Sequence, residues 1–306
     1  MTTTSPASPQ LVGIGCVLGA VFLFSLQDAL IKALSGDYAL HEVILARASV
    51  AALVLLVVAR TEGVRCVLCT ARPLLNILRG LFIVVTNMCF FLALASMPLA
   101  DAVALFFVAP LFITLLSIPI LGERVGRHRW TAVLVGMVGV FVMLRPGDGG
   151  FDRVALLPLL AALGYAATQM VTRRIGLADR ASTMAMYIQV TFICVSLCFG
   201  LIAGDGRFAE SGGASWQFLL RAWVIPELDD AVLVLVIGLL NAFGAWLMTQ
   251  AYRTCEATTV APFEYVALPF SMLWGLLLWG DWPGPSTLMG IGLIIGAGLY
   301  VFYREA

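Results

Sequence analysis

The sequence predicts an all-α integral membrane protein in which ten transmembrane helices form two inverted five-helix repeats. Three observations predict this fold class: an apolar composition, ten apolar runs of spanning length, and a match between the two halves of the chain. Of the 306 residues, 61% are hydrophobic and 12% are charged, and the mean hydropathy is +0.99. Soluble domains carry about 45–50% apolar and about 25% charged residues, so the composition excludes a soluble globular protein.

The ten spans are predicted from the length of the apolar runs. A helix needs about 20 mostly apolar residues to cross a membrane. Breaks at clusters of charged and turn residues leave runs over 11–34, 39–59, 74–95, 99–121, 130–145, 154–175, 182–203, 231–252, 256–279 and 285–303. Because these runs lack the period-two alternation of barrel strands, they are predicted to be helices.

The charges are distributed unevenly between the two predicted faces. The 18 Lys and Arg residues balance the 18 Asp and Glu residues, so nothing points to a nucleic-acid partner. Ten spans place both termini on one side, and that side receives twelve basic residues: Arg60, Arg65, Arg72, Arg79, Arg124, Arg127, Arg129, Arg173, Arg174, Arg180, Arg253 and Arg304. The opposite side receives five: Lys32, Arg145, Arg153, Arg207 and Arg221. Because Lys and Arg are enriched on cytoplasmic loops, we expect both termini in the cytoplasm.

All cations but one are arginines, which favours a GC-rich bacterial genome and hence a cell inner membrane.

Two segments lie outside the predicted spans. Residues 1–10 are polar and uncharged, and we expect a disordered tail without the basic region and cleavage site of a signal peptide. The longest loop, 204–230, is predicted to be extracytoplasmic and contains Trp216 and Trp223. It is either a segment lying in the membrane interface, which the tryptophans suit, or a partly ordered loop.

No residue pattern indicates an enzyme, a metal site or a cofactor. His41 and His128 fall in predicted loops at different membrane faces, and the sequence contains no phosphate-binding Gly-x-x-x-x-Gly-Lys loop. Cys66 and Cys69 have the spacing of a metal-ligand pair, but no second pair or histidine lies near them in the sequence. The odd number of cysteines, seven, and their mainly apolar surroundings predict no disulfide framework.

The second half of the chain repeats features of the first. The matching pairs, at offsets of 142 and then 158 residues, are Gln27–Lys32 with Gln169–Arg174, Arg47 with Gln189, Gly80 with Gly238, Phe112 with Phe270, and Gly122-Glu123 with Gly280-Asp281. Residues 11–148 and 149–303 then hold five spans each. Because five is odd, the second repeat must start on the opposite side of the membrane. Inverted repeats of this kind are typical of transporters whose solute site lies near the membrane midplane.

The residues that carry this repeat also resemble a known family. The segments are Leu94 to Glu123, Val260 to Tyr265, Gly280 to Pro283, and the start Phe24 to Lys32, with Arg47 in the second span. They resemble the EamA family of the drug/metabolite transporter superfamily over residues 11–303. The resemblance implies a basket-like bundle of ten helices around a central cavity. Asp281 departs from the usual Glu but keeps the charge.

Two charged residues are predicted to lie at similar depth in the first two spans. At about 1.5 Å per residue, Asp28 and Arg47 lie roughly 10 and 12 Å from the outer surface. Lys32 competes for Asp28, because the two are four residues apart on one helix. The alternatives are a structural bridge from Asp28 to Arg47 or Lys32, and a cavity group that binds substrate or a proton.

A third ionisable residue, Glu264, lies roughly 12 Å from the cytoplasmic side of the ninth span. It stands between Pro262 and Pro269, and Arg253 is the one cation expected near its level. Prolines free backbone carbonyls, which is tolerated where a helix lines a cavity. Glu264 is either a proton carrier or ligand for a cationic solute, or a neutral carboxyl group with a structural hydrogen bond.

The uncharged polar residues of the spans more often bond to a neighbouring helix than to a ligand. They are Gln27, Asn87, Gln169, Gln189, Asn241 and Gln250. Aromatic residues of the same segments either pack or line an amphiphilic pocket: Phe106, Phe107, Tyr165, Trp246, Tyr265 and Trp274. The predicted substrate-binding residues are Gln27, Asp28, Arg47, Asn87, Gln169, Asn241, Glu264 and Tyr265.

These observations favour a secondary transporter that moves a small organic solute across the lipid bilayer by alternating access, coupled to protons or to exchange. An acid and a base in the cavity suit an amino acid or a nucleoside-like solute, and the segments around Asp28 and Pro262 are similar to members that take up S-adenosylmethionine. A membrane-embedded enzyme acting on lipid, and a non-transporting scaffold or receptor, are the alternatives. A homodimer stays open.

Overall fold

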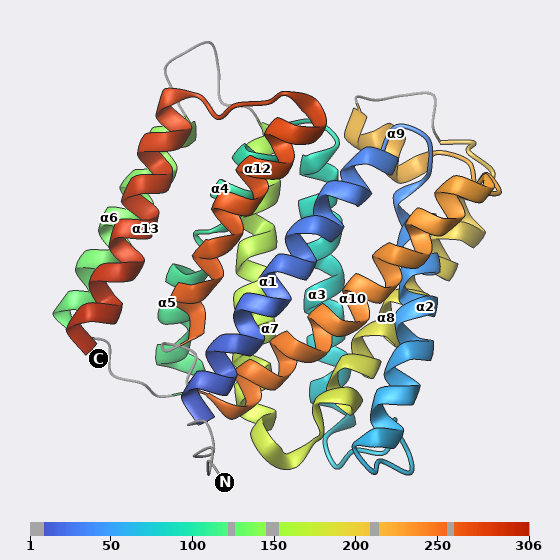
Figure 1. Cartoon of the computed structure of the whole chain (residues 1–306), viewed down its shortest axis with the longest axis horizontal. Coiled ribbons are helices and arrows are strands. Elements are labelled where there is room, and N and C mark those ends of the chain that lie inside the picture. The colour runs from blue at the N-terminus through green and yellow to red at the C-terminus, as the bar shows by residue number, and fades with distance from the viewer. Residues whose placement is uncertain (1–8, 122–125, 145–152, 209–213, 256–259, 306) are drawn as a thin grey trace, which may run out of the picture.

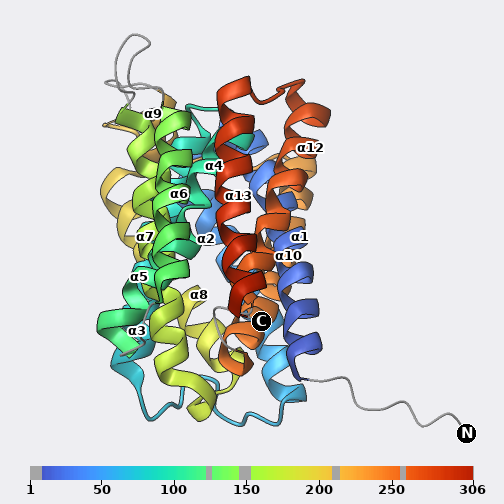
Figure 2. The ribbon, with the colours of Figure 1, turned by 90° about the vertical axis from the view of Figure 1, so that its left-hand side faces the viewer.

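The computed structural model describes residues 9–121, 126–144, 153–208, 214–255 and 260–305, and all regular elements in these ranges are helices. The predicted all-α class is therefore confirmed. Most of the predicted tail lies outside the described residues. Figures 1 and 2 show long helices that run up and down along one axis.

The first half contributes six helices. They are α1 (Pro9–Leu34), α2 (Leu40–Thr61), α3 (Pro73–Leu94), α4 (Leu99–Phe106), α5 (Ala109–Leu121) and α6 (Arg127–Leu144). The second half contributes η1 (Arg153–Ala155), α7 (Leu156–Ile175), η2 (Gly176–Ala178), α8 (Ala181–Ala203), α9 (Ala214–Leu220), α10 (Leu228–Thr254), η3 (Ala261–Val266), α12 (Ala267–Trp279) and α13 (Pro285–Glu305).

Seven helical segments in the described ranges have the length and the composition to cross a membrane. They coincide with the predicted spans from 11–34 to 99–121 and from 154–175 to 231–252. The other three predicted spans correspond to α6 and to two shorter apolar segments, Phe263–Trp279 and Pro285–Ala297. A membrane fold follows from these helices, and ten crossings stay a prediction.

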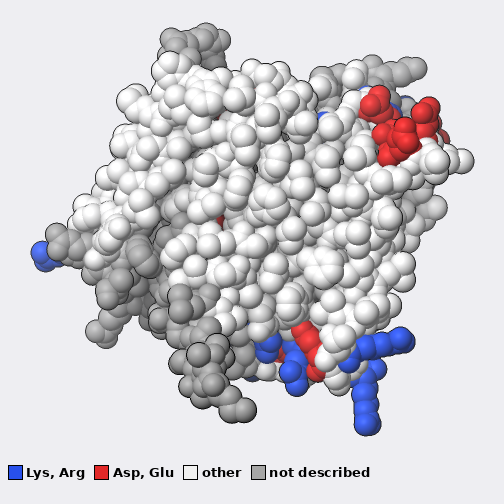
Figure 3. Space-filling model, viewed as in Figure 1, with Lys and Arg blue, Asp and Glu red and all other residues white. Residues whose placement is uncertain are grey.

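The outer surface of the bundle suits a lipid environment. Large apolar side chains point outward, including Leu53 (66% exposed), Phe141 (64%) and Leu201 (86%). Figure 3 shows a wide uncharged belt on this face, with basic residues gathered at its lower end and acidic residues at its upper right. Exposed apolar surface of this extent marks contact with a membrane or a partner.

The fourth span of each half is interrupted at the same place. Phe107 and Val108 separate α4 from α5, and the 3-10 turn η3 precedes α12. Helices α5 and α12 begin at Ala109 and Ala267, which are 158 residues apart, the offset found in the sequence. Each interruption lies beside a proline, which cannot donate a backbone hydrogen bond within a helix.

Helix packing follows the same correspondence. Helix α1 packs on α10 and α3 on α7, α2 packs on α8, and α6 packs on α13. Gly80 of α3 brings its helix against Thr191 of α8, and the matching Gly238 of α10 brings its helix against Val50 of α2. Exchanging the two halves therefore turns the α1–α10 contact into the α3–α7 contact and leaves the α2–α8 and α6–α13 contacts unchanged.

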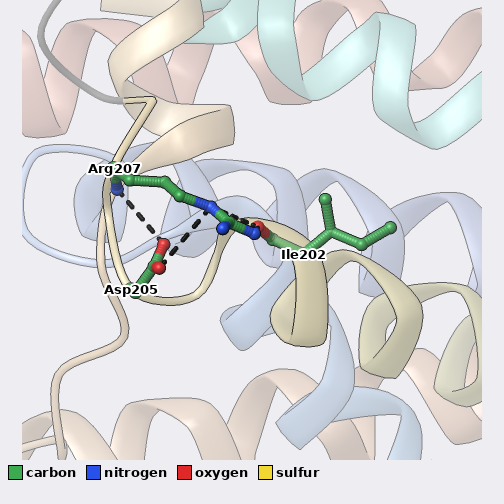
Figure 4. Close-up of polar contacts among 3 residues, drawn as sticks. All are labelled: Ile202, Asp205 and Arg207. Carbon is green, nitrogen blue, oxygen red and sulfur yellow. Dashed lines mark hydrogen bonds and ion pairs between the residues drawn. The ribbon is translucent and has the colours of Figure 1, made fainter.

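The predicted extracytoplasmic loop is partly helical. Helix α9 buries Phe218 and Leu219 and leaves Trp216 exposed. Before it, Arg207 folds back onto the end of α8, where its Nη2 and Nε donate to the carbonyl of Ile202 at 2.6 and 3.2 Å (Figure 4). Its Nε also lies 3.5 Å from Asp205 Oδ2. Residues 209–213 lie outside the described part of the chain.

Two sequence expectations were wrong. Cys66 and Cys69 form a disulfide in the connection between α2 and α3, because the tight turn there places their Cα atoms 5.3 Å apart. His41 is not in a loop but in the first turn of α2, where it is buried near Phe199 and Trp223. His128 falls within α6, although its side chain is not described.

The close contact at Gly238 yields a stability prediction. A Cβ atom there would lie 2.5 Å from Val50 Cβ and 3.1 Å from the Arg47 carbonyl, so Gly238→Ala must push α10 away from α2. Overpacking costs about 1–3 kcal/mol, and the melting temperature of the detergent-solubilised protein should fall. Gly15→Ala is the control, because a Cβ there meets nothing within 4 Å. Equal melting temperatures for the two variants would contradict the tight α2–α10 contact.

Candidate functional site

A cavity of about 170 Å³ lies inside the bundle, enclosed by residues from both halves of the chain. Its wall is mainly apolar, and seven aromatic side chains face it: Phe24, Phe90, Phe91, Phe106, Phe107, Tyr165 and Phe192. A mostly apolar wall with a few convergent polar groups is typical of small-molecule sites. Such sites usually enclose about 300–1,000 Å³, so this conformation accommodates part of a drug-sized molecule.

Six of the eight predicted binding residues line this cavity. They are Gln27, Asp28, Asn87, Gln169, Asn241 and Glu264. The other two, Arg47 and Tyr265, are buried behind its wall. Of the aromatic candidates, Phe106, Phe107 and Tyr165 line the cavity, whereas Trp246 donates to Glu62 and Trp274 donates to Ser25.

Glu264 lies in η3, at the interruption of the second half. It is 4% exposed, and its Oε2 accepts a hydrogen bond from the Tyr165 hydroxyl at 2.9 Å. Its Oε1 accepts a second bond from the Tyr252 hydroxyl. Within the described ranges no cation lies at ion-pairing distance, and Arg253 instead donates to Gln250 at 2.9 Å. Two phenol donors therefore hold this buried carboxyl group in the cavity wall.

The structure forms neither of the bridges considered for Asp28. Its carboxylate accepts a bond of 3.4 Å from the neighbouring Gln27 amide, and Gln27 in turn accepts one of 2.9 Å from Asn241. Lys32 donates to the Met97 carbonyl at 2.7 Å, away from Asp28. In the described part of the chain, no cation lies within 4 Å of Asp28, and its carboxylate is free to meet a ligand.

Arg47 supports the cavity from behind its wall. Its guanidinium is fully buried and donates to Asn87 Oδ1 at 2.9 Å. It also lies over the rings of Phe91 and Phe192, 5.5 and 5.0 Å from their centroids. Cation–π contact and one charged hydrogen bond thus hold three wall side chains in place. Arg47 therefore contacts the residues of the wall and does not line the cavity itself.

A second buried arginine, Arg79, was not expected from the sequence. Arg79 was assigned to the cytoplasmic surface, yet it is 3% exposed and lines the cavity. Its Nε donates to Thr172 at 2.6 Å, its Nη1 to the Met184 carbonyl at 2.8 Å and its Nη2 to Thr249 at 3.0 Å. The depth estimate used for Arg47 would have found it, because Arg79 lies roughly 9 Å along α3 from its start at Pro73.

Tyr165 and Tyr252 were missed as partners of Glu264 for a different reason. They come from α7 and α10, and Glu264 comes from η3, so the three meet only in the folded bundle. Tyr165 was named as an aromatic wall candidate, but no spacing in the sequence indicated its hydrogen bond.

Comparisons with known proteins show the family and the fold of the chain. The model of the EamA-like transporter family matches the chain twice, over residues 11–145 and 153–303. One solved protein structure superposes with a TM-score of 0.66 at 18% identity and covers 98% of both chains, which shows the same fold.

Relatives of known name are small-molecule transporters. A riboflavin transporter of Rhizobium johnstonii is 32% identical over 69% of this chain and 64% of its own length. An S-adenosylmethionine uptake transporter of Rickettsia bellii is 26% identical over 96% of this chain and 94% of its own. The pseudopaline exporter of Pseudomonas aeruginosa is 27% identical over 93% of this chain and 94% of its own length.

The three bonds of Arg79 predict a structural cost for its replacement. Hydrogen bonds to charged groups contribute about 1.5–3 kcal/mol each, so Arg79→Gln should lower the melting temperature by roughly 5 °C or more. Arg72→Gln is the matched control, because Arg72 is exposed at the start of α3 and its side chain makes one hydrogen bond in the described part of the chain, to the Arg174 carbonyl. If Arg72→Gln lowered the melting temperature as much as Arg79→Gln, the burial of Arg79 would not explain its contribution to stability.

Proposed function

Because the chain belongs to the EamA-like transporter family, we propose that it is a secondary active transporter of a small organic metabolite. The observation that carries this proposal is the cavity between the two halves, which has a buried carboxyl group at an interrupted helix. Family membership excludes the alternative of a membrane-embedded enzyme. Transport by alternating access across the bacterial inner membrane, with both termini cytoplasmic, completes the proposal.

Hydrogen bonds support opposite directions for the two repeats, 11–148 and 149–303. Arg72, at the start of α3, donates to the carbonyl of Arg174 in the last turn of α7, so α3 and α7 run antiparallel. Lys32, in the last turn of α1, donates to Met97, just beyond the end of α3, so α1 and α3 run parallel. It follows that α1 and α7 run in opposite directions, as an inverted repeat requires.

The interrupted helices support a solute site near the midplane. Transporter sites are typically formed where helices of two repeats are broken, because the freed backbone groups face a water-filled cavity. Both interruptions lie at this cavity, through Phe106 and Phe107 on one side and Glu264 on the other. The small cavity must widen to admit a whole solute and then close again, which is what alternating access requires.

The charges of the cavity suit a solute that carries both signs. Asp28 and Glu264 face it as acids and Arg79 as a base. Relatives named for riboflavin, S-adenosylmethionine and pseudopaline include both uptake and export, so they support an organic metabolite without choosing a direction. We propose an amino acid, a nucleoside-like or an S-adenosylmethionine-like solute, bound by Gln27, Asp28, Asn87, Gln169, Asn241 and Glu264.

Glu264 is proposed as the coupling group. When it is ionised, both of its oxygens accept bonds from tyrosines. When it is protonated, one oxygen becomes a donor, so either a tyrosine hydroxyl turns to accept this bond or the carboxyl group finds another acceptor. A carboxyl group whose hydrogen bonds change in this way on protonation can carry one proton in each transport cycle, if the cavity opens to alternate sides of the membrane.

The coupling proposal predicts the response of transport to pH. In proteoliposomes with a metabolite panel, an imposed proton gradient should raise the initial solute flux of the wild type severalfold. Glu264→Gln cannot exchange the proton, so its flux should not respond to the gradient. Asp205→Asn, which changes an exposed acid outside the cavity, should respond like the wild type.

Two results would count against these proposals separately. Equal responses of Glu264→Gln and the wild type would remove Glu264 as the coupling site. Flux of every tested solute at the level of empty liposomes would contradict the transporter proposal and favour a scaffold or receptor.

A further inference from the structure

A carboxamide without hydrogen-bond partners lies in the cavity wall. Gln189 of α8 is fully buried and lines the cavity. Neither its Oε1 nor its Nε2 has a partner in the part of the chain that the structure describes. Asn241 of α10 also lines the cavity, and its Oδ1 is likewise unpartnered there. Buried amide groups are almost always hydrogen-bonded, so a bound molecule or water has to supply these partners.

Aromatic rings in fixed positions border the same part of the wall. Phe192 lies three residues after Gln189 on α8, on the same face of the helix, and it lines the cavity together with Phe91 of α3. The Arg47 guanidinium holds both rings from behind. The cavity thus offers flat apolar surfaces next to a carboxamide.

The chemistry of a carboxamide defines what can pair with it. Its oxygen accepts and its nitrogen donates side by side in one plane. The complement is an edge that presents a donor beside an acceptor, as adenine does to Asn or Gln side chains. A flat ring that carries such an edge can also stack on phenylalanine. A flexible zwitterion without a ring could bond to the carboxamide but would not use the aromatic surfaces.

We propose that Gln189 is a specificity residue that recognises the edge of a flat heteroaromatic ring with a hydrogen-bond donor next to an acceptor. The ring lies against Phe192 and Phe91, and Asn241 Oδ1 accepts a further hydrogen bond from the solute. A cavity of about 170 Å³ accommodates part of a drug-sized molecule, and this assignment makes the ring that part. The inference rests on the proposed transport function and names the substrate class.

Binding to the purified full chain in nanodiscs tests the proposal. The probes are adenosine and N6,N6-dimethyladenosine, which lacks the edge donor, and riboflavin with its N3-methyl derivative as a second pair. The wild type should bind the unmethylated member of at least one pair about tenfold tighter, because a site built to bond a donor rejects the analogue without it.

Gln189→Met, which keeps the length of the side chain, should bind that probe about tenfold more weakly and lose the preference. Gln250→Met should keep both properties, because Gln250 does not line the cavity.

Each outcome decides the proposal. It is overturned if Gln189→Met keeps the affinity and the preference, since water then satisfies Gln189. It is also overturned if the wild type shows no preference within either pair, a comparison that needs no variant and so holds even if Gln189→Met fails to fold. Flux of other solutes in proteoliposomes separates the transport proposal from the ring proposal. If the protein transports a solute but binds none of the ring probes, the ring proposal is rejected and the transport proposal stands. Absence of both flux and binding rejects the transport function and this inference with it.

Discussion

The lack of water in the membrane interior is the constraint on which the rest of this structure depends. Each buried polar group needs a partner from the protein, from a bound molecule or from a trapped water, since lipid offers none. Arg79 meets this need with two threonines and a backbone carbonyl from three different helices. Glu264 meets it with two tyrosines. These bonds connect the helices around the cavity, so the polar groups that could serve function also hold the bundle together.

The two halves share a scaffold but not their chemistry. Gly80 and Gly238 make equivalent close contacts, and α5 and α12 begin at equivalent residues. At the interruptions, however, Phe106 in the first half stands where Glu264 stands in the second. A symmetric frame suits the proposed exchange between two similar conformations, whereas the unequal side chains give one half alone the carboxyl group proposed for coupling.

Arg47 and Gln189 illustrate the same division. They occupy matching positions on α2 and α8, and both are fully buried. Arg47 turns to Asn87 and two phenylalanine rings and so supports the wall. Gln189 faces the cavity with its amide group unpaired in the described structure. One position stabilises the wall, and the other is available to a ligand.

The sequence by itself determined the helical membrane class and the correspondence of the halves, because run length and matching residues are properties of the chain alone. It also predicted the seven helices that have spanning length in the described ranges. It also singled out Asp28, Asn87 and Glu264 as polar residues inside the predicted spans, and all three line the cavity. Tertiary structure decided which partners these groups meet. Three features depend on which helix faces which side chain. They are the hydrogen bond from Tyr165 to Glu264, the position of the Arg47 side chain behind the cavity wall, and the burial of Arg79. That choice arises from packing between segments distant in sequence, which depth along a single helix does not encode.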